Sequence, residues 1–187
     1  MPTGEIQTDA IVRDALAAGK QVFVPYLHKS PPDSTDAPAR VMDMVRLGSI
    51  QDYEALQPDR WGIPSIDPSS VHERQRILGG PDARNSSLDL VLMPGVAFDV
   101  DEETGAVRRL GHGKGFYDLF LHRYSTRLAV KTADKEDRPL WLYGLALTEQ
   151  FLVAEAGDGG VPVGPQDRSL HGVILGDGEI KALGTAK

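Results

Sequence analysis

The sequence predicts an α/β fold, a three-layer sandwich in which helices flank a mostly parallel central sheet. Segments with helical spacing alternate with short apolar segments that indicate strands, which is the order expected of an α/β protein. The most apolar segment, residues 88–93 (LDLVLM), resembles a parallel strand that is covered on both faces. The 187 residues suit one domain over 1–187, because domains commonly contain about 100–200 residues.

Three segments are predicted to be helical. Thr8 is a candidate N-cap, and apolar residues then recur at helical spacing until Gly19: Ile11, Val12, Ala15 and Leu16. Ser49, with an aspartate three residues on, resembles a capping box that opens a short helix ending at Leu56. Compatible spacing of apolar residues predicts the third helix over 117–123.

The strands and loops follow from apolar runs and turn-forming residues. Strands are predicted at residues 22–25, 41–47, 88–93, 128–131, 141–147 and 173–175. Turn-forming, acidic or charged residues predict loops at 30–38, 99–105 and 133–138, and 61–85 is irregular.

Composition excludes several classes of protein. Lys and Arg number 20 against 27 Asp and Glu, so the net charge of −7 argues against a nucleic-acid or membrane-surface binder, which needs a basic face. The absence of cysteine excludes disulfides, a thiolate zinc site and a cysteine nucleophile. No apolar run approaches the roughly 18 residues of a membrane span, and the first residues show no signal peptide. We therefore expect a cytoplasmic protein, with a mitochondrial location left open.

Residues 108–118 carry the candidate chemistry. Gly111, Gly113 and Gly115 alternate with larger residues directly before a predicted helix, and glycine lets the backbone approach a ligand closely. The N–H groups of such a loop, together with a helix N-terminus, bind anions. Three positive charges support an anion site here: Arg108, Arg109 and Lys114.

The glycine loop matches neither of two familiar phosphate loops. The dinucleotide fingerprint needs glycine where Phe116 stands, and the Walker loop needs serine or threonine where Gly115 stands. A surface turn of glycine and lysine is therefore kept as the alternative to phosphate binding.

Two further residues each have two interpretations. Asp118, at the start of the predicted helix, either complements the helix dipole or, beside a phosphate site, binds Mg²⁺. Trp61 either packs as a large apolar side chain or forms a stacking wall for a flat heterocycle. The histidines at 28, 72, 112, 122 and 171 lack the spacing of a zinc motif.

Two motifs carry a resemblance to a known family. Residues 92–99 (LMPGVAFD) contain Pro-Gly-x-x-Phe-Asp, and residues 109–118 (RLGHGKGFYD) contain Arg-Leu-Gly-x-Gly-x-Gly, an aromatic residue and Tyr-Asp. Together they resemble the 5-formyltetrahydrofolate cyclo-ligases, also called methenyltetrahydrofolate synthetases. Weaker matches lie at 5–8, 19–25, 61–64, 144–150 and 161–167, so the likeness covers nearly the whole chain.

The resemblance implies an α/β fold and a reaction that uses ATP and Mg²⁺. ATP phosphorylates the formyl oxygen of 5-formyltetrahydrofolate, N10 attacks the activated carbon, and phosphate leaves. The products are 5,10-methenyltetrahydrofolate, ADP and phosphate. Phosphoryl transfer asks the protein mainly for positioning and charge neutralisation, which a basic glycine loop and Mg²⁺ would supply.

The resemblance also implies a role for each matching residue. The ATP-binding residues would be Arg109, Leu110, Gly111, His112, Gly113, Lys114, Gly115, Phe116 and Tyr117. The catalytic residues among them would be Arg109, Lys114 and Tyr117. The folate would contact Glu5, through its pterin, together with Trp61, Gly113 and Tyr117. The Mg²⁺ ligands would be Asp118 and Asp167.

The chain departs from the family pattern in two places. Phe116 stands where tyrosine is commoner, which removes one hydroxyl group. The family also begins well before the counterpart of Glu5, with a helix whose lysine and arginine help to bind ATP. The alternative function is therefore a shortened folate-binding relative with weak or no catalytic activity. In either case we expect a monomer that binds 5-formyltetrahydrofolate, without nucleic acid or membrane.

Overall fold

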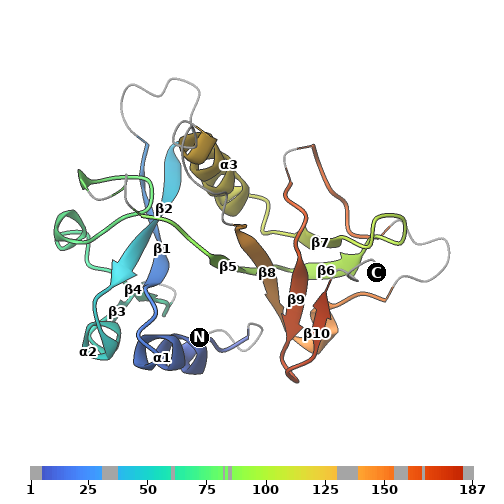
Figure 1. The fold of residues 1–187 in the computed structure, drawn as a ribbon, viewed down its shortest axis with the longest axis horizontal. Helices are drawn as coiled ribbons and strands as arrows, with labels where there is room; N and C mark the ends of the chain where they lie inside the picture. Colours follow the sequence, from blue (N-terminus) through green and yellow to red (C-terminus); the bar gives the residue numbers. More distant parts are fainter. Residues whose placement is uncertain are drawn as a thin grey trace. The chain divides into compact units, whose positions relative to one another are not determined.

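The computed structural model describes residues 6–30, 38–59, 62–81, 83, 86–129, 139–153, 160–165 and 167–182. Its helices, shown in Figure 1, are α1 (Asp9–Ala17), α2 (Ile50–Glu54) and α3 (Phe116–Ala129), with 3₁₀ turns at Val71–Glu73 and Thr148–Gln150. The strands are β1 (Val22–Lys29), β2 (Arg40–Leu47), β3 (Gln57–Pro58), β4 (Pro64–Ser65), β5 (Leu90–Pro94), β6 (Ala97–Val100), β7 (Val107–Leu110), β8 (Trp141–Ala146), β9 (Gly172–Leu175) and β10 (Ile180–Ala182). This mixture of helices and strands confirms the predicted α/β class.

The strands form four sheets within the described residues. The largest has the order β10-β9-β8-β5, in which the β5–β8 and β8–β9 pairs are parallel and the β9–β10 pair is antiparallel. The β1–β2, β3–β4 and β6–β7 pairs are separate antiparallel ribbons. Parallel pairing thus occurs where the apolar 88–93 segment predicts it, but a three-layer sandwich around one mostly parallel sheet is not confirmed.

The chain packs as two compact units. Among the described residues, the first unit contains those between 7 and 87 and between 119 and 129, and the second contains residue 6 and those between 88 and 118 and between 139 and 182. Helix α3 begins in the second unit and continues in the first. The single domain expected over 1–187 stays a prediction.

The first unit is built on a long hairpin of β1 and β2. The two strands pair over their whole length, from Val22 opposite Leu47 to Lys29 opposite Arg40. The predicted strand 22–25 ended at Pro25, yet β1 continues past it, because an edge strand tolerates a residue without an N–H donor. Strand β2 confirms the strand predicted at 41–47, and most of its residues are buried. Most of the loop expected at 30–38 lies outside the described residues.

The two short helices of this unit test the predicted caps. The Ser49 side chain accepts from the Asp52 N–H at 3.1 Å and begins α2, as predicted. The Asp52 carboxylate accepts from the Gly48 N–H at 2.7 Å, so the reciprocal bond of the capping box goes to the preceding residue. Thr8 precedes α1, but its side chain makes no capping hydrogen bond with any described residue.

Helix α3 is longer than the sequence predicts. Phe120, Leu121 and Tyr124 are buried along one face, and the helix continues beyond them to Ala129. The strand predicted at 128–131 is therefore wrong at its first two residues, and the other two lie outside the described residues. Arg127 lies in this added length, where its guanidinium donates to the backbone carbonyls of Ile77, Ala83 and Ser86 and helps to hold the end of the helix.

The second unit is organised around Phe98, whose side chain is fully buried. A Cβ atom on Gly95 would lie 2.6 Å from its ring, and one on Gly144 would also meet the ring and come within 3.1 Å of Val173. Both glycines are therefore needed for space rather than for an unusual backbone conformation. The sequence predicted the acidic turn at 99–105 but not the flanking strands β6 and β7, which this ring helps to anchor.

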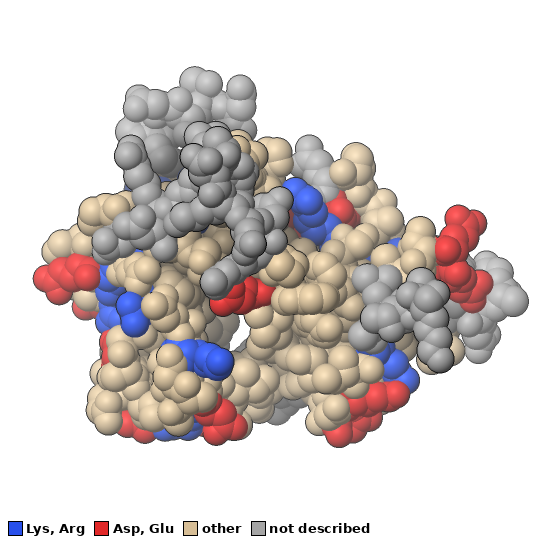
Figure 2. Space-filling model, in the orientation of Figure 1, with Lys and Arg blue, Asp and Glu red and all other residues tan. Residues whose placement is uncertain are grey.

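Charge is mixed on the face of the molecule that Figure 2 shows. On the face shown in Figure 2, Lys and Arg side chains are interspersed with Asp and Glu and form no single basic patch. Among the described residues, no helix is both long and apolar enough to cross a lipid bilayer.

We predict that Gly144→Ala destabilises the protein by about 1–3 kcal/mol, because the new methyl group would overpack the Phe98 ring and Val173. Urea denaturation followed by circular dichroism measures this loss. Gly176→Ala is the matched control in the same unit, because its nearest neighbour would lie at an ordinary 3.6 Å. Equal stabilities of the two variants would contradict this account of the core.

Candidate functional site

The glycine loop at 111–115 lies directly before α3, as the sequence predicts, and it follows β7, which the sequence did not predict. Gly113 and Gly115 have φ angles of +75° and +61°, in the left-handed region that side chains rarely adopt. A Cβ atom on either would have no neighbour within 4 Å among the described residues. These two glycines are thus required by the backbone conformation, and the space around them is open.

The predicted ATP-binding residues occupy the loop and the two elements beside it. Leu110 ends β7, and Phe116 and Tyr117 are the first two residues of α3. The side chains of His112 and Lys114 are exposed on the loop between them. No described residue forms an ion pair with Lys114, which is exposed and lies two residues before the first residue of α3. This arrangement of N–H groups and charge suits an anion.

Arg109 and Asp118 form a nearly buried ion pair at the same place. Arg109 Nη2 donates to Asp118 Oδ2 at 2.8 Å, and the two side chains are only 7% and 13% exposed. Arg109 Nη1 donates to the Pro94 carbonyl at 3.2 Å, and the guanidinium lies 5.8 Å from the centre of the Tyr117 ring. Arg109 Nε is buried and has no hydrogen-bond partner among the described residues. The structure thus brings together three of the predicted site residues.

Gly111 has a different role from the other loop glycines. A Cβ atom on Gly111 would lie 2.9 Å from Arg109 Nη1, so the missing side chain makes room for the guanidinium. Because that neighbour is the end of a flexible side chain, a larger residue at 111 would displace Arg109 rather than disrupt the fold.

The two predicted Mg²⁺ ligands lie on segments that meet. The Arg168 N–H, next to Asp167 in the chain, donates to Asp118 Oδ1 at a long 3.4 Å. Asp167 Oδ2 accepts from the Gly164 N–H at 2.7 Å and shapes its own turn. No group of three or more His, Asp or Glu side chains in the described part of the chain could enclose a metal ion. Mg²⁺ commonly takes one or two carboxylates plus substrate phosphates, so carboxylates at 118 and 167 fit such an ion.

The structure corrects the role expected of Arg108. Its side chain does not face the glycine loop but forms two hydrogen bonds to the fully buried Asp99, at 2.6 and 2.7 Å, and one to Asp101 at 3.0 Å. Asp99 also accepts from the Val161 N–H at 2.7 Å. Burial raises the pKa of Asp99, but the Arg108 and Val161 hydrogen bonds outweigh it, so this pKa lies below its ordinary value.

Gln150 and Pro94 are site-supporting residues that the sequence reasoning missed. Gln150 Nε2 donates to the Gly95 carbonyl at 3.1 Å, and its Oε1 accepts from the Leu147 N–H at 2.8 Å. The Pro94–Gly95 turn that it holds supplies the carbonyl bound by Arg109. The Pro-Gly motif was the available signal, although it named no role for the carbonyl.

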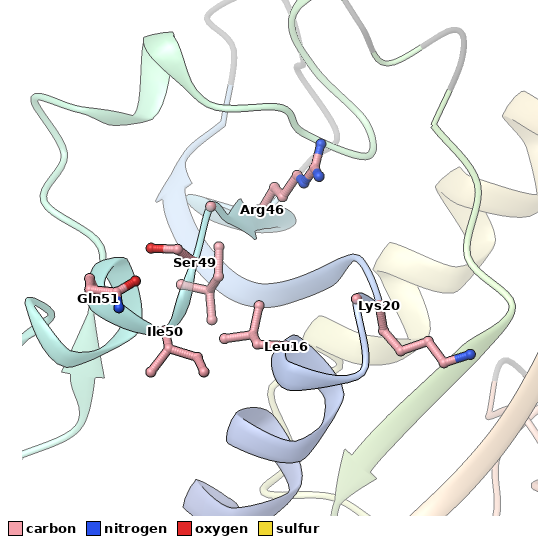
Figure 3. Close-up of a pocket in the computed structure, with 9 residues that line it drawn as sticks. Leu16, Lys20, Arg46, Ser49, Ile50 and Gln51 are labelled. Carbon is pink, nitrogen blue, oxygen red and sulfur yellow. The ribbon is translucent and has the colours of Figure 1, made fainter.

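Two predicted folate-binding residues, Glu5 and Trp61, lie outside the described residues. The first unit contains a hollow of about 380 Å³ lined by residues of α1, β2 and α2. In Figure 3, Leu16 and Ile50 lie near each other there, whereas the ends of Lys20 and Arg46 point away from them. This hollow contains none of the predicted site residues, and its polar groups do not converge.

The fold and the site define an α/β protein with a glycine-rich loop that leads into a helix beside a buried Arg–Asp pair. The sequence model of the 5-formyltetrahydrofolate cyclo-ligase family matches residues 1–176. The chain therefore belongs to the 5-formyltetrahydrofolate cyclo-ligase family, and the predicted class, an enzyme of folate metabolism, is confirmed.

Curated relatives carry the same name. The chain is 35% identical over 176 residues to a Caenorhabditis elegans protein named probable 5-formyltetrahydrofolate cyclo-ligase, covering 92% of this chain and 68% of the worm protein. It is 34% identical over 174 residues to the 5-formyltetrahydrofolate cyclo-ligase of Mus musculus, with the same two coverages. The Saccharomyces cerevisiae enzyme of that name is 33% identical over 186 residues, covering 96% of this chain and 74% of the yeast protein.

We predict that Asp99→Asn lowers the free energy of unfolding at pH 7 by about 3 kcal/mol or more, because it leaves the Arg108 charge without its buried partner. The pKa of Asp99 is lower in the folded chain than the roughly 3.9 of an unfolded aspartate. Its ionisation therefore stabilises the protein above about pH 4, and this contribution is lost as the pH falls through the folded-state pKa.

Urea denaturation at a series of pH values measures the difference between the wild-type protein and Asp99→Asn, which should shrink below about pH 4. Glu103→Gln, exposed in the turn of the same hairpin, is the control and should change the unfolding energy by less than about 0.5 kcal/mol. A difference that stays constant from neutral to acid pH would contradict the assigned role of Asp99.

Proposed function

We propose that this chain catalyses the ATP- and Mg²⁺-dependent conversion of 5-formyltetrahydrofolate to 5,10-methenyltetrahydrofolate, with release of ADP and phosphate. The observation that carries the proposal is the open glycine loop before α3, with an exposed Lys114 and a buried Arg109 beside it. Membership of the cyclo-ligase family supports the reaction.

The loop would hold the transferring phosphoryl group. The formyl oxygen attacks the γ-phosphorus of ATP and ADP leaves, after which N10 attacks the formyl carbon, loses its proton and expels phosphate. Negative charge spreads over the phosphoryl oxygens during the first step. The loop N–H groups, Lys114 and Arg109 would neutralise that charge at the reacting phosphate. We assign the remaining loop residues, from Leu110 to Tyr117, to ATP binding on the same basis.

Asp118 and Asp167 would bind Mg²⁺, which neutralises charge on the ATP phosphates when bound. Their carboxylate oxygens are the hard donors that this ion prefers, and a site of only two carboxylates leaves room for phosphate oxygens. The Arg168 N–H keeps the second segment against Asp118.

The folate would contact Glu5 and Trp61, with Gly113 and Tyr117 nearest the formyl group. A carboxylate at position 5 suits the row of N–H donors on a pterin, and an indole at 61 suits stacking on a flat ring. A folate-binding protein with little catalytic activity is the second candidate. We propose a monomer that acts in the cytoplasm, with a mitochondrial location as the alternative.

We expect methenyltetrahydrofolate, followed by its absorbance, to form only when ATP and Mg²⁺ are both present, with one ADP released for each product. Omitting ATP, omitting Mg²⁺ and adding EDTA are the controls. Formation of product at an equal rate without ATP would overturn the proposed reaction. Tight binding of 5-formyltetrahydrofolate without any turnover would favour the second candidate.

We expect Lys114→Ala to lower the rate of turnover by about 100-fold or more, because it removes a preorganised cation next to the developing phosphate charge. The variant should keep the unfolding energy of the wild-type protein, since Lys114 is exposed. Lys29→Ala, which removes an exposed lysine from β1, is the matched control. Equal activity of Lys114→Ala and Lys29→Ala would show that Lys114 does not contact the reacting phosphate.

A further inference from the structure

Arg109 and the expected metal ion make competing demands on Asp118. The Asp118 Oδ2 atom accepts from Arg109 at 2.8 Å, and Oδ1 accepts the long 3.4 Å bond from the Arg168 N–H. The side chains of Arg109 and Asp118 are only 7% and 13% exposed, so water screens their charges weakly. A divalent cation bound to Asp118 would therefore meet a guanidinium already neutralising the same carboxylate.

The resting position of Arg109 leaves the guanidinium incompletely satisfied. Its Nε is buried and has no partner among the described residues, which is unfavourable for a charged donor. A phosphate group can accept two hydrogen bonds from one guanidinium. It could therefore accept from Nε, to which neither the Pro94 carbonyl nor Asp118 is bonded. Arg109 thus has a better-matched partner as soon as a phosphate reaches the loop.

The loop beside Arg109 has room for the side chain to leave Asp118. Gly111 presents no side chain against Arg109 Nη1, and the spaces beside Gly113 and Gly115 are open. The movement needs only rotation of side-chain torsions, so the strand β7 that carries Arg109 can stay in place.

We propose that Arg109 occupies the metal position on Asp118 until phosphate arrives, and that it then exchanges Asp118 for the phosphate and frees the carboxylate for the metal ion. The proposal rests on the proposed function, because it takes ATP and Mg²⁺ as the ligands. Arg109 is here a positioning residue that couples the two sites. Coupling of this kind is reciprocal, so the metal strengthens phosphate binding by the factor by which phosphate strengthens metal binding.

The first experiment measures binding of Mn²⁺, as a spectroscopic substitute for Mg²⁺, to the full chain without nucleotide. Arg109→Gln should bind Mn²⁺ at least about tenfold more tightly than the wild-type protein, because it removes the competing cation. Gly111→Ala, which keeps the charge but displaces the guanidinium, should shift the affinity in the same direction. Arg168→Gln removes an exposed charge while keeping the N–H, and should stay within about threefold of wild type.

An unchanged or weaker Mn²⁺ affinity in both Arg109→Gln and Gly111→Ala would overturn the proposal. Circular dichroism shows whether each variant is folded, and Gly111→Ala keeps the test valid if Arg109→Gln is not. An equal gain in Arg168→Gln would also overturn it, because the effect would then be general electrostatics.

The second experiment measures ATP binding by calorimetry in EDTA and again with Mg²⁺. Asp118→Asn should bind metal-free ATP more tightly than wild type, because Arg109 is already released and a repelling carboxylate is gone. With Mg²⁺ present, Asp118→Asn should bind ATP more weakly than wild type, because the variant lacks the carboxylate that would bind the metal ion. Weaker binding of Asp118→Asn under both conditions would overturn the exchange. A wild-type protein that binds no ATP under either condition would overturn the proposed function, and the Mn²⁺ ranking would then decide on the competition at Asp118.

Discussion

The pairing of Arg108 with Asp99 determines where the next residue of β7 points, and the candidate site depends on it. Side chains alternate along a strand, so burying Arg108 against Asp99 directs Arg109 to the opposite face, toward Asp118. Asp99 also holds the Val161 N–H, which fixes the start of the segment that reaches Asp118 at residue 168. One buried carboxylate therefore organises both sides of the site, although it has no expected contact with a ligand.

Elements that depend on local signals were predicted well from the sequence. The Ser49 cap, the strands at 41–47 and 141–147 and the start of α3 each follow from a few neighbouring residues, and the structure contains them all. The failures depend on distant partners. The end of α3 is held in part by three carbonyl groups that Arg127 binds more than 40 residues away in the chain, which no local pattern indicates. The β6–β7 ribbon likewise depends on how Phe98 packs against Gly144, far along the sequence.

The site shows the same division. The loop glycines and Lys114 were identified from their spacing, because backbone freedom and charge are properties of the residues themselves. The ion pairs of Arg108 and Arg109, and the lack of one at Lys114 among the described residues, could not be identified in this way. The type of a residue does not say which carboxylate its charge will meet. Arg108 and Arg109 are adjacent in the sequence, yet one stabilises the fold and the other lies at the site. Their roles differ because adjacent side chains on strand β7 point to opposite faces.

The close packing of Phe98 between Gly95 and Gly144 has an evolutionary consequence. Each of the three positions sets the volume available to the others, so a larger residue at either glycine is tolerated only if position 98 becomes smaller at the same time. A single substitution that enlarges either glycine would give an overpacked core. Substitutions at the three positions should therefore occur together in proteins that evolve from this one.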